Sequence, residues 1–323
     1  TTDVLSKRTK LAGGVLQSLG TAFPDMALGV VAALVSLSLR ETNYVLAVSY
    51  AVMAAATTFG SNIYNIGHAT WCVWRQNLAN QKKKSVIMFP GLKAGGFLRP
   101  LTEHQNKPSF LELDTAIEVL TALTILTATV AVAMVLFGRI IKPLSGFEGD
   151  LYQLIKPVGV VIFLLCLLIM YLFRKTQRAI SSENEKIEEK RYYSDRSNPV
   201  IWLHLGISGL AILLTAESMV YAVQTVCNLT GLPVVVAGVL AGLIGCLGEM
   251  IVVHNFSVHP QGRLADALVG VGMDNIVTTM GASIVAMMGG IFLGGNALIL
   301  IFVIILTLNT LLITQIAKLK NFI

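Results

Sequence analysis

Residues 20–39 read GTAFPDMALGVVAALVSLSL, an apolar stretch with one proline and one carboxylate, Pro24 and Asp25. A segment of this length is long enough to cross the roughly 30 Å hydrocarbon core of a bilayer as a helix. The whole chain has the same character, because its 323 residues are 54% hydrophobic and only 13% charged. Soluble domains are usually about a quarter charged. The sequence therefore predicts an integral membrane protein of the all-α class.

Further apolar segments follow along the chain, and together they predict a polytopic transmembrane helix bundle. Eight spans are expected, at about residues 11–39, 44–74, 115–138, 153–173, 200–227, 233–256, 264–289 and 295–317. The polar stretch 176–198 separates a first half, 1–175, from a second half, 199–323. We expect this stretch to be a cytoplasmic linker and each half to contain four of the spans.

The distribution of positive charge predicts the orientation of these spans. If the N-terminus lies inside, the inner connections and the C-terminal tail carry 20 of the 24 lysines and arginines. Positive residues are concentrated in cytoplasmic loops of membrane proteins, so we expect a cytoplasmic N-terminus. The net charge of +6 is then explained by topology and lipid head groups, and it does not indicate a nucleic-acid partner.

Carboxylates within the predicted spans are the main candidates for function, since ionisable groups inside a membrane are costly and commonly mark an ion or substrate path. Asp25 and Glu249 each follow a short glycine-containing stretch, about fifteen residues into their spans. The two spans run in opposite directions through the membrane. This arrangement predicts two inverted-topology repeats with a site at the midplane. For either residue alone, a structural carboxylate bonded to a neighbouring helix is the competing interpretation.

A second motif follows each carboxylate on the next span. In TTFGSNIYNIG, Ser61 and Asn65 are four residues apart and therefore lie on one helix face. In LVGVGMDNIVTTMGAS, Asp274 and Asn275 are adjacent, and a shift of one residue turns a helix by about 100°. Both cannot face the site in the same way, and the sequence leaves the choice open. Helix packing alone is an alternative role for the glycines and Ser61.

Pro24 directly precedes Asp25 and supports the hypothesis of a site at the midplane. A proline removes a backbone donor and disrupts the preceding turn, so carbonyls of residues 19–21 are expected to lose partners. Inside a membrane this is tolerated where the carbonyls face protein, a cavity or an ion. Together with carboxylates, hydroxyls and amides they would make an all-oxygen site, which suits hard cations such as Ca²⁺ and also Na⁺. In the second half, Gly245 and Gly248 are expected to loosen the helix.

GTAFPD with GSNIYN, and IGCLGE with VGVGMDNI, resemble the two alpha-repeats of the cation/calcium exchanger superfamily, which includes the sodium/calcium exchangers. The resemblance implies ten helices in two inverted halves of five, of which about eight are present here. It implies acidic ligands at Asp25 and Glu249 and hydroxyl ligands at Thr21 and Ser61. It places the amide or acid positions on Asn65 and Asn275. The second repeat has Gly245, Cys246 and Val271 where hydroxyl residues are typical.

The position of the carboxylate-bearing span within each half indicates whether further helices accompany this chain. The carboxylate lies on the first span of one half and on the second span of the other half. If the halves are equivalent, one helix is expected before residue 1 and another after residue 323. A longer protein or pairing with another chain, including a homo-oligomer, would supply them. Glu217 then lies on the presumed gating helix, either as a gate or proton-linked group or as an interhelical hydrogen-bond partner. His68 and His254 are expected to be packing or interface residues.

The function that these features favour is secondary active antiport. The expected reaction exchanges Ca²⁺ or a related cation for Na⁺ or H⁺ by alternating access. Its partners are inorganic cations and the lipid bilayer, with no resident cofactor and no enzyme activity. One alternative is a transport-deficient or regulatory relative of the same fold, because the second repeat lacks hydroxyls. A remote alternative is an intramembrane aspartyl protease that uses Asp25 and Asp274 as its acid and base.

Overall fold

The computed structural model describes residues 13–141, 150–183, 196–259 and 261–323. Side chains are not described for residues 13–17, 19 and 174–183. The long helices are α2 Gly13–Leu39, α3 Tyr44–Lys82, α4 Phe110–Phe137, α5 Lys156–Glu183, α6 Asn198–Thr230, α7 Val234–Gly245, α8 Leu247–Val258, α9 Leu264–Met288 and α10 Gly295–Leu319. The short 3₁₀ helices are η1 Leu101–Glu103 and η2 Lys320–Phe322.

The predicted helical bundle is confirmed for the described residues. Among them, seven helices are long and apolar enough to cross a membrane, or up to eight if the bent pair α7 and α8 is one span. All eight predicted segments overlap helices. The linker prediction for 176–198 is only partly testable, because α5 continues to Glu183, α6 begins at Asn198, and residues 184–195 lie outside the described part.

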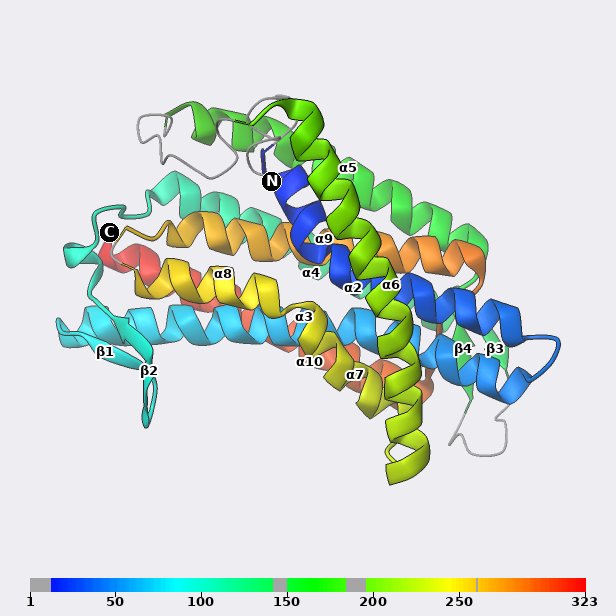
Figure 1. Cartoon of the computed structure of the whole chain (residues 1–323). Coiled ribbons are helices and arrows are strands. Elements are labelled where there is room, and N and C mark those ends of the chain that lie inside the picture. The colour runs from blue at the N-terminus through cyan, green and yellow to red at the C-terminus, as the bar shows by residue number, and fades with distance from the viewer. Residues whose placement is uncertain (1–12, 142–149, 184–195, 260) are drawn as a thin grey trace.

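Helix α3 forms the centre of the bundle. In its most apolar window 83% of the residues are buried, against 11% in the window of α6. Asn43 caps the start of α3 by accepting a hydrogen bond from the Leu46 backbone N–H at 3.1 Å. Figure 1 shows α3 along the length of the bundle, with α6 crossing on the outside. The motif residues of α3 are therefore enclosed on several sides by other helices.

Small strands lie at the two ends of the bundle, in addition to the predicted helices. The hairpin of β1 Val86–Phe89 and β2 Leu92–Leu98 is antiparallel and lies at the end where α3 finishes (Figure 1). The other end has an antiparallel sheet of β3 Arg139–Ile141, β4 Leu151–Gln153 and β5 Phe292–Gly294. These strands occur in the connections, so the membrane-spanning part of the bundle remains helical.

The two carboxylate-bearing segments differ from each other in backbone structure. Helix α2 is continuous through Pro24, so the predicted disruption of the preceding turn is wrong. What Pro24 removes is only the hydrogen bond that its nitrogen cannot donate to the Gly20 carbonyl. The interruption lies instead in the second half, where α7 ends at Gly245 and α8 begins at Leu247, with a bend of 51° between them. The loosening expected near Gly245 is therefore present as a break.

Candidate cation site

Three buried carboxylates lie on α2, α8 and α9, the helices that pack around α3. Asp25 is 0% exposed, Glu249 is 3% exposed and Asp274 is 7% exposed. They lie near enough to interact electrostatically, because the charges of Asp25 and Asp274 both act on Glu249, and Asp274 acts on Asp25. Figure 1 shows α2 running toward the β3–β4 end and α8 running away from it. The two helices therefore bring Asp25 and Glu249 into the core in opposite directions.

One face of α2 carries a polar row at helical spacing, Ser18, Thr21 and Asp25. The Thr21 hydroxyl donates to Asp274 Oδ1 on α9 at 2.9 Å. Ser18, which is 2% exposed, also lies within hydrogen-bonding reach of the Asp274 carboxylate. Ser18 is a site residue that the sequence analysis missed. Its position three residues before Thr21 and seven before Asp25, on the same helix face, is the signal that could have identified it.

Asp25 lies directly against the break between α7 and α8. A Cβ atom added to Gly245 would fall 1.7 Å from Asp25 Oδ1 and 2.8 Å from its Cγ, so only glycine leaves room for the carboxylate. Neither Asp25 oxygen has a hydrogen-bond partner among the described residues. Ser61 lies beside this carboxylate, but its hydroxyl donates to the Thr58 carbonyl at 2.8 Å. The Asp25 oxygens are thus buried, close to a helix break and free to accept.

Glu249 and Asn65 join the two motifs across the α3–α8 interface. The Asn65 amide Nδ2 donates to Glu249 Oε2 at 2.5 Å. Glu249 lies in the first turn of α8, where the partial positive charge of a helix N-terminus favours a carboxylate. The other oxygens of the pair, Glu249 Oε1 and Asn65 Oδ1, are buried without a partner. This pair therefore offers two further acceptor atoms in the core.

The buried acceptors define the chemical character of the site. The buried atoms that lack a partner in the described structure include four oxygens of the motif residues: Asp25 Oδ1, Asp25 Oδ2, Glu249 Oε1 and Asn65 Oδ1. Each such group costs about 1–3 kcal/mol when it is left unpaired. Carboxylate and amide oxygens are the ligands that hard cations prefer. In the described ranges no three His, Cys, Asp or Glu side chains are grouped to hold a metal ion, so amide and hydroxyl oxygens are needed to complete a site.

Asp274 and Asn275 point to different partners. Asp274 accepts from Thr21, as described above, and thereby contacts α2. Asn275 is 1% exposed and donates from Nδ2 to the Val271 carbonyl of its own helix at 2.9 Å. The carboxylate rather than the amide therefore joins the polar row on α2. The resemblance places the amide or acid ligand on Asn275, whereas in the structure it is Asp274 that contacts the polar row of α2.

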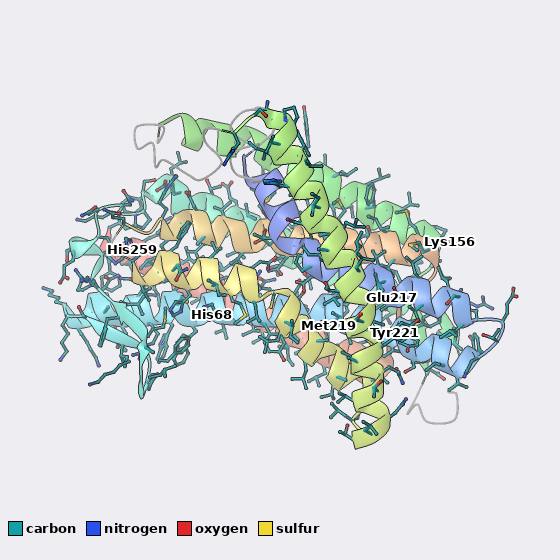
Figure 2. All side chains as sticks on the ribbon, in the orientation of Figure 1. His68, Lys156, Glu217, Met219, Tyr221 and His259 are labelled. Carbon is teal, nitrogen blue, oxygen red and sulfur yellow. The ribbon has the colours of Figure 1, made fainter. Side chains whose placement is uncertain are left out.

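Two further groups lie outside this cluster. Glu217 is exposed on α6 (Figure 2) and its side chain makes no hydrogen bond within the described structure, so the alternative of an interhelical hydrogen bond is not realised there. His68 of α3 and His254 of α8 stack with their ring centroids 5.8 Å apart. Phe89 of the β1–β2 hairpin stacks on His254 at 5.7 Å. The two histidines therefore pack at the interface between α3, α8 and the hairpin.

The bundle and its buried polar core define a helical membrane protein. Comparisons of the chain with protein-family models, with curated proteins and with solved structures find no match. The exchanger resemblance accordingly rests on the four motifs in the sequence, and any more specific function is a proposal.

Proposed function

We propose that this protein is a secondary antiporter that exchanges Ca²⁺ or a related cation for Na⁺ or H⁺ by alternating access. The observation that carries the proposal is the set of unpartnered buried oxygens on Asp25, Asn65 and Glu249. Acceptor atoms without donors, enclosed by apolar helices, are stabilised by a cation that binds between them. The cation is the transported substrate and no resident cofactor is required.

The opposite directions of α2 and α8 support the transport part of the proposal. Many secondary transporters bind their substrate near the midplane, between two inverted repeats and at interrupted helices. Here the α7–α8 break faces Asp25, and the continuous helix α2 brings Asp25 in the opposite direction. We propose that the two halves are inverted repeats and that the N-terminal end of the chain is cytoplasmic. Opening of the site alternately to each side would then require motion at the α7–α8 bend.

Ion flux into proteoliposomes tests the proposal. Purified protein is reconstituted and Ca²⁺ uptake is followed with an outward gradient of Na⁺ or of H⁺. We expect gradient-driven uptake that is lost in Asp25→Asn and in Glu249→Gln, because each change removes a negative charge from the site. Glu118→Gln is the matched control, since Glu118 is exposed on α4. Uptake that persists in both site variants would overturn the assignment.

A transport-deficient relative of the same fold is the second candidate. It is favoured by the second half, where Gly245 and Cys246 contribute no hydroxyl and Asn275 bonds to its own helix. If the protein is such a relative, neither a Na⁺ gradient nor an H⁺ gradient drives Ca²⁺ uptake, although the protein is folded and as stable as a packed bundle. The protease alternative requires Asp25 and Asp274 to share a proton, and no hydrogen bond joins them, since both Asp25 oxygens lack a described partner.

A further inference from the structure

A second polar site lies at the end of the bundle that carries strands β3 to β5, and none of its lining residues is a motif residue. It is a pocket of about 310 Å³. It is lined by Arg40, Tyr44, Arg139, Ile140, Ile141, Gln153 and Phe292. Of the described lining residues, two are arginines and none is acidic. The described lining therefore carries positive charge that no acidic residue within it neutralises.

Arg40 is held in place by the backbone and by an aromatic ring. Its guanidinium donates to the Gly289 carbonyl and lies over the Phe292 ring, with Cζ 5.8 Å from the centroid. Gln153 Nε2 donates to the same carbonyl at 3.2 Å. One carbonyl uses only part of the five N–H donors of a guanidinium. Arg40 is therefore a fixed cation with donors to spare.

Arg139 provides the second positive charge of the pocket. Arg139 is exposed, and its side chain makes no hydrogen bond or ion pair in the described structure. Tyr44, the first residue of α3, adds the N-terminal end of a long helix to the same pocket. The partial positive charge there acts in the same direction as the two guanidinium groups. Arginine pairs favour phosphate, because the planar guanidinium can bind two phosphate oxygens at once.

The position of the pocket indicates a ligand at the membrane surface. Arg40 follows the last residue of α2, and Arg139 lies two residues after the end of α4. The neighbouring apolar side chains are exposed, with Leu136 at 67%, Phe137 at 62% and Ile140 at 56%. Apolar surface directly beside a basic pocket suits a phospholipid, with acyl chains along the helix and the head group at the arginines.

We propose that this pocket binds a phosphate group between Arg40 and Arg139, supplied by an anionic phospholipid or by free phosphate. The site goes beyond the proposed transport function and does not depend on it, because none of its residues belongs to the carboxylate cluster. Arg139 is the better residue to change, since its side chain makes no hydrogen bond or ion pair in the described structure. Arg40 contributes to the packing of Gly289 and Phe292 and would confound the result.

Native mass spectrometry of the full chain in detergent, titrated with phosphatidylglycerol, tests the proposal. We expect one tightly bound lipid, and Arg139→Gln should weaken its apparent Kd by roughly tenfold or more. Lys156→Gln is the matched control. Lys156 begins α5, is exposed (Figure 2) and does not line the pocket, so this variant should bind as the unaltered protein does. Unchanged thermal unfolding of both variants establishes that they are folded.

A parallel titration with inorganic phosphate identifies the source of the phosphate group. If phosphatidylglycerol binds with Arg139 dependence and inorganic phosphate does not displace it, the ligand is a lipid head group. If inorganic phosphate binds or displaces the lipid with the same dependence, the pocket takes the free anion, and the site itself is supported. Equal binding by Arg139→Gln and the unaltered chain, or no binding of either probe, would overturn the proposal.

Discussion

Gly245 has no side chain, and this absence leaves room for the Asp25 carboxylate in the candidate site. The Asp25 carboxylate occupies the space where a Cβ atom would lie, 1.7 Å from Oδ1. Gly248, three residues later, has nothing within 4 Å of the same hypothetical atom. At the α7–α8 break, the requirement for glycine therefore comes from the contact with Asp25 and is absent at Gly248.

We predict that Gly245→Ala destabilises the protein by about 1–3 kcal/mol, as overpacking of a buried contact does. Gly248→Ala is expected to be neutral or slightly stabilising, because alanine is a better helix former than glycine. Chemical unfolding of both variants in detergent measures the difference. Equal effects of the two substitutions would mean that Asp25 does not occupy the position described here.

At the scale of helices, α3 and α7 cross through small residues. A Cβ atom on Gly238 would meet the Ala56 Cβ at 2.7 Å, and one on Gly242 would meet the Thr57 carbonyl oxygen at 2.6 Å. In the other direction, a Cβ atom on Gly60 would meet Val239 Cα at 2.7 Å. Small residues at such spacing let two helix backbones approach closely inside a membrane. This crossing positions the α7–α8 break against Asp25.

We expect Gly242→Ala to separate α3 from α7, because its new methyl group would meet backbone atoms that cannot move aside. The free energy of unfolding in an SDS titration should fall by about 1–3 kcal/mol. Gly206→Ala on α6, where nothing lies within 4 Å, is the control and should unfold like the original chain. If Gly206→Ala lowered the free energy of unfolding by the same amount, the effect of Gly242→Ala could not be assigned to the α3–α7 crossing.

The connection from β2 to α4 is attached to the polar end of α3. Gln76 Nε2 donates to the Arg99 carbonyl at 2.6 Å, and Asn80 Oδ1 accepts from the Leu101 backbone N–H at 2.8 Å. His104, 6% exposed, has Nε2 3.2 Å from the same Arg99 carbonyl. Burial lowers the pKa of His104 below its ordinary value, which is about 6.5.

This shift predicts the pH dependence of the connection. A histidine with a lowered pKa takes up its proton more readily in the unfolded state, so its contribution to stability is complete above pH of about 6.5 and is lost progressively below it. Amide hydrogen-exchange protection of residues 99–104 should therefore decrease between pH 7 and pH 5. His104→Gln should abolish this decrease. Protection that is equally pH-dependent in the variant would assign the effect to another group.

For the molecule as a whole, hydropathy predicts the helices because each segment must bury apolar surface in lipid or protein. It does not predict the full length of α3, whose last turns contain buried Arg75, Gln76 and Asn77. These polar side chains are stabilised by distant backbone, such as the Ile87 carbonyl that accepts from Arg75 and the Gln315 carbonyl that accepts from Asn77 at 2.9 Å. Such partners are set by tertiary packing and have no local signal in the sequence.

In the candidate site, too, the sequence predicts some of the residues and only the packed structure identifies the others. The paired motifs single out Asp25, Asn65 and Glu249 from the sequence, because buried carboxylates and amides are rare and costly in a membrane. The choice between Asp274 and Asn275 depends on which helix face meets α2, and only the packed structure places Thr21 next to Asp274. The break at Cys246 and the continuity of α2 through Pro24 likewise depend on the neighbouring helices.

We propose that the buried oxygens of Asp25, Asn65 and Glu249 bind the transported cation. Isothermal titration of the purified chain with Ca²⁺, in the absence and presence of Na⁺, measures this directly. We expect saturable Ca²⁺ binding that Na⁺ weakens, that Asp25→Asn abolishes and that Glu118→Gln leaves unchanged. Absence of Ca²⁺ binding to the folded protein, or equal binding by Asp25→Asn, would contradict it.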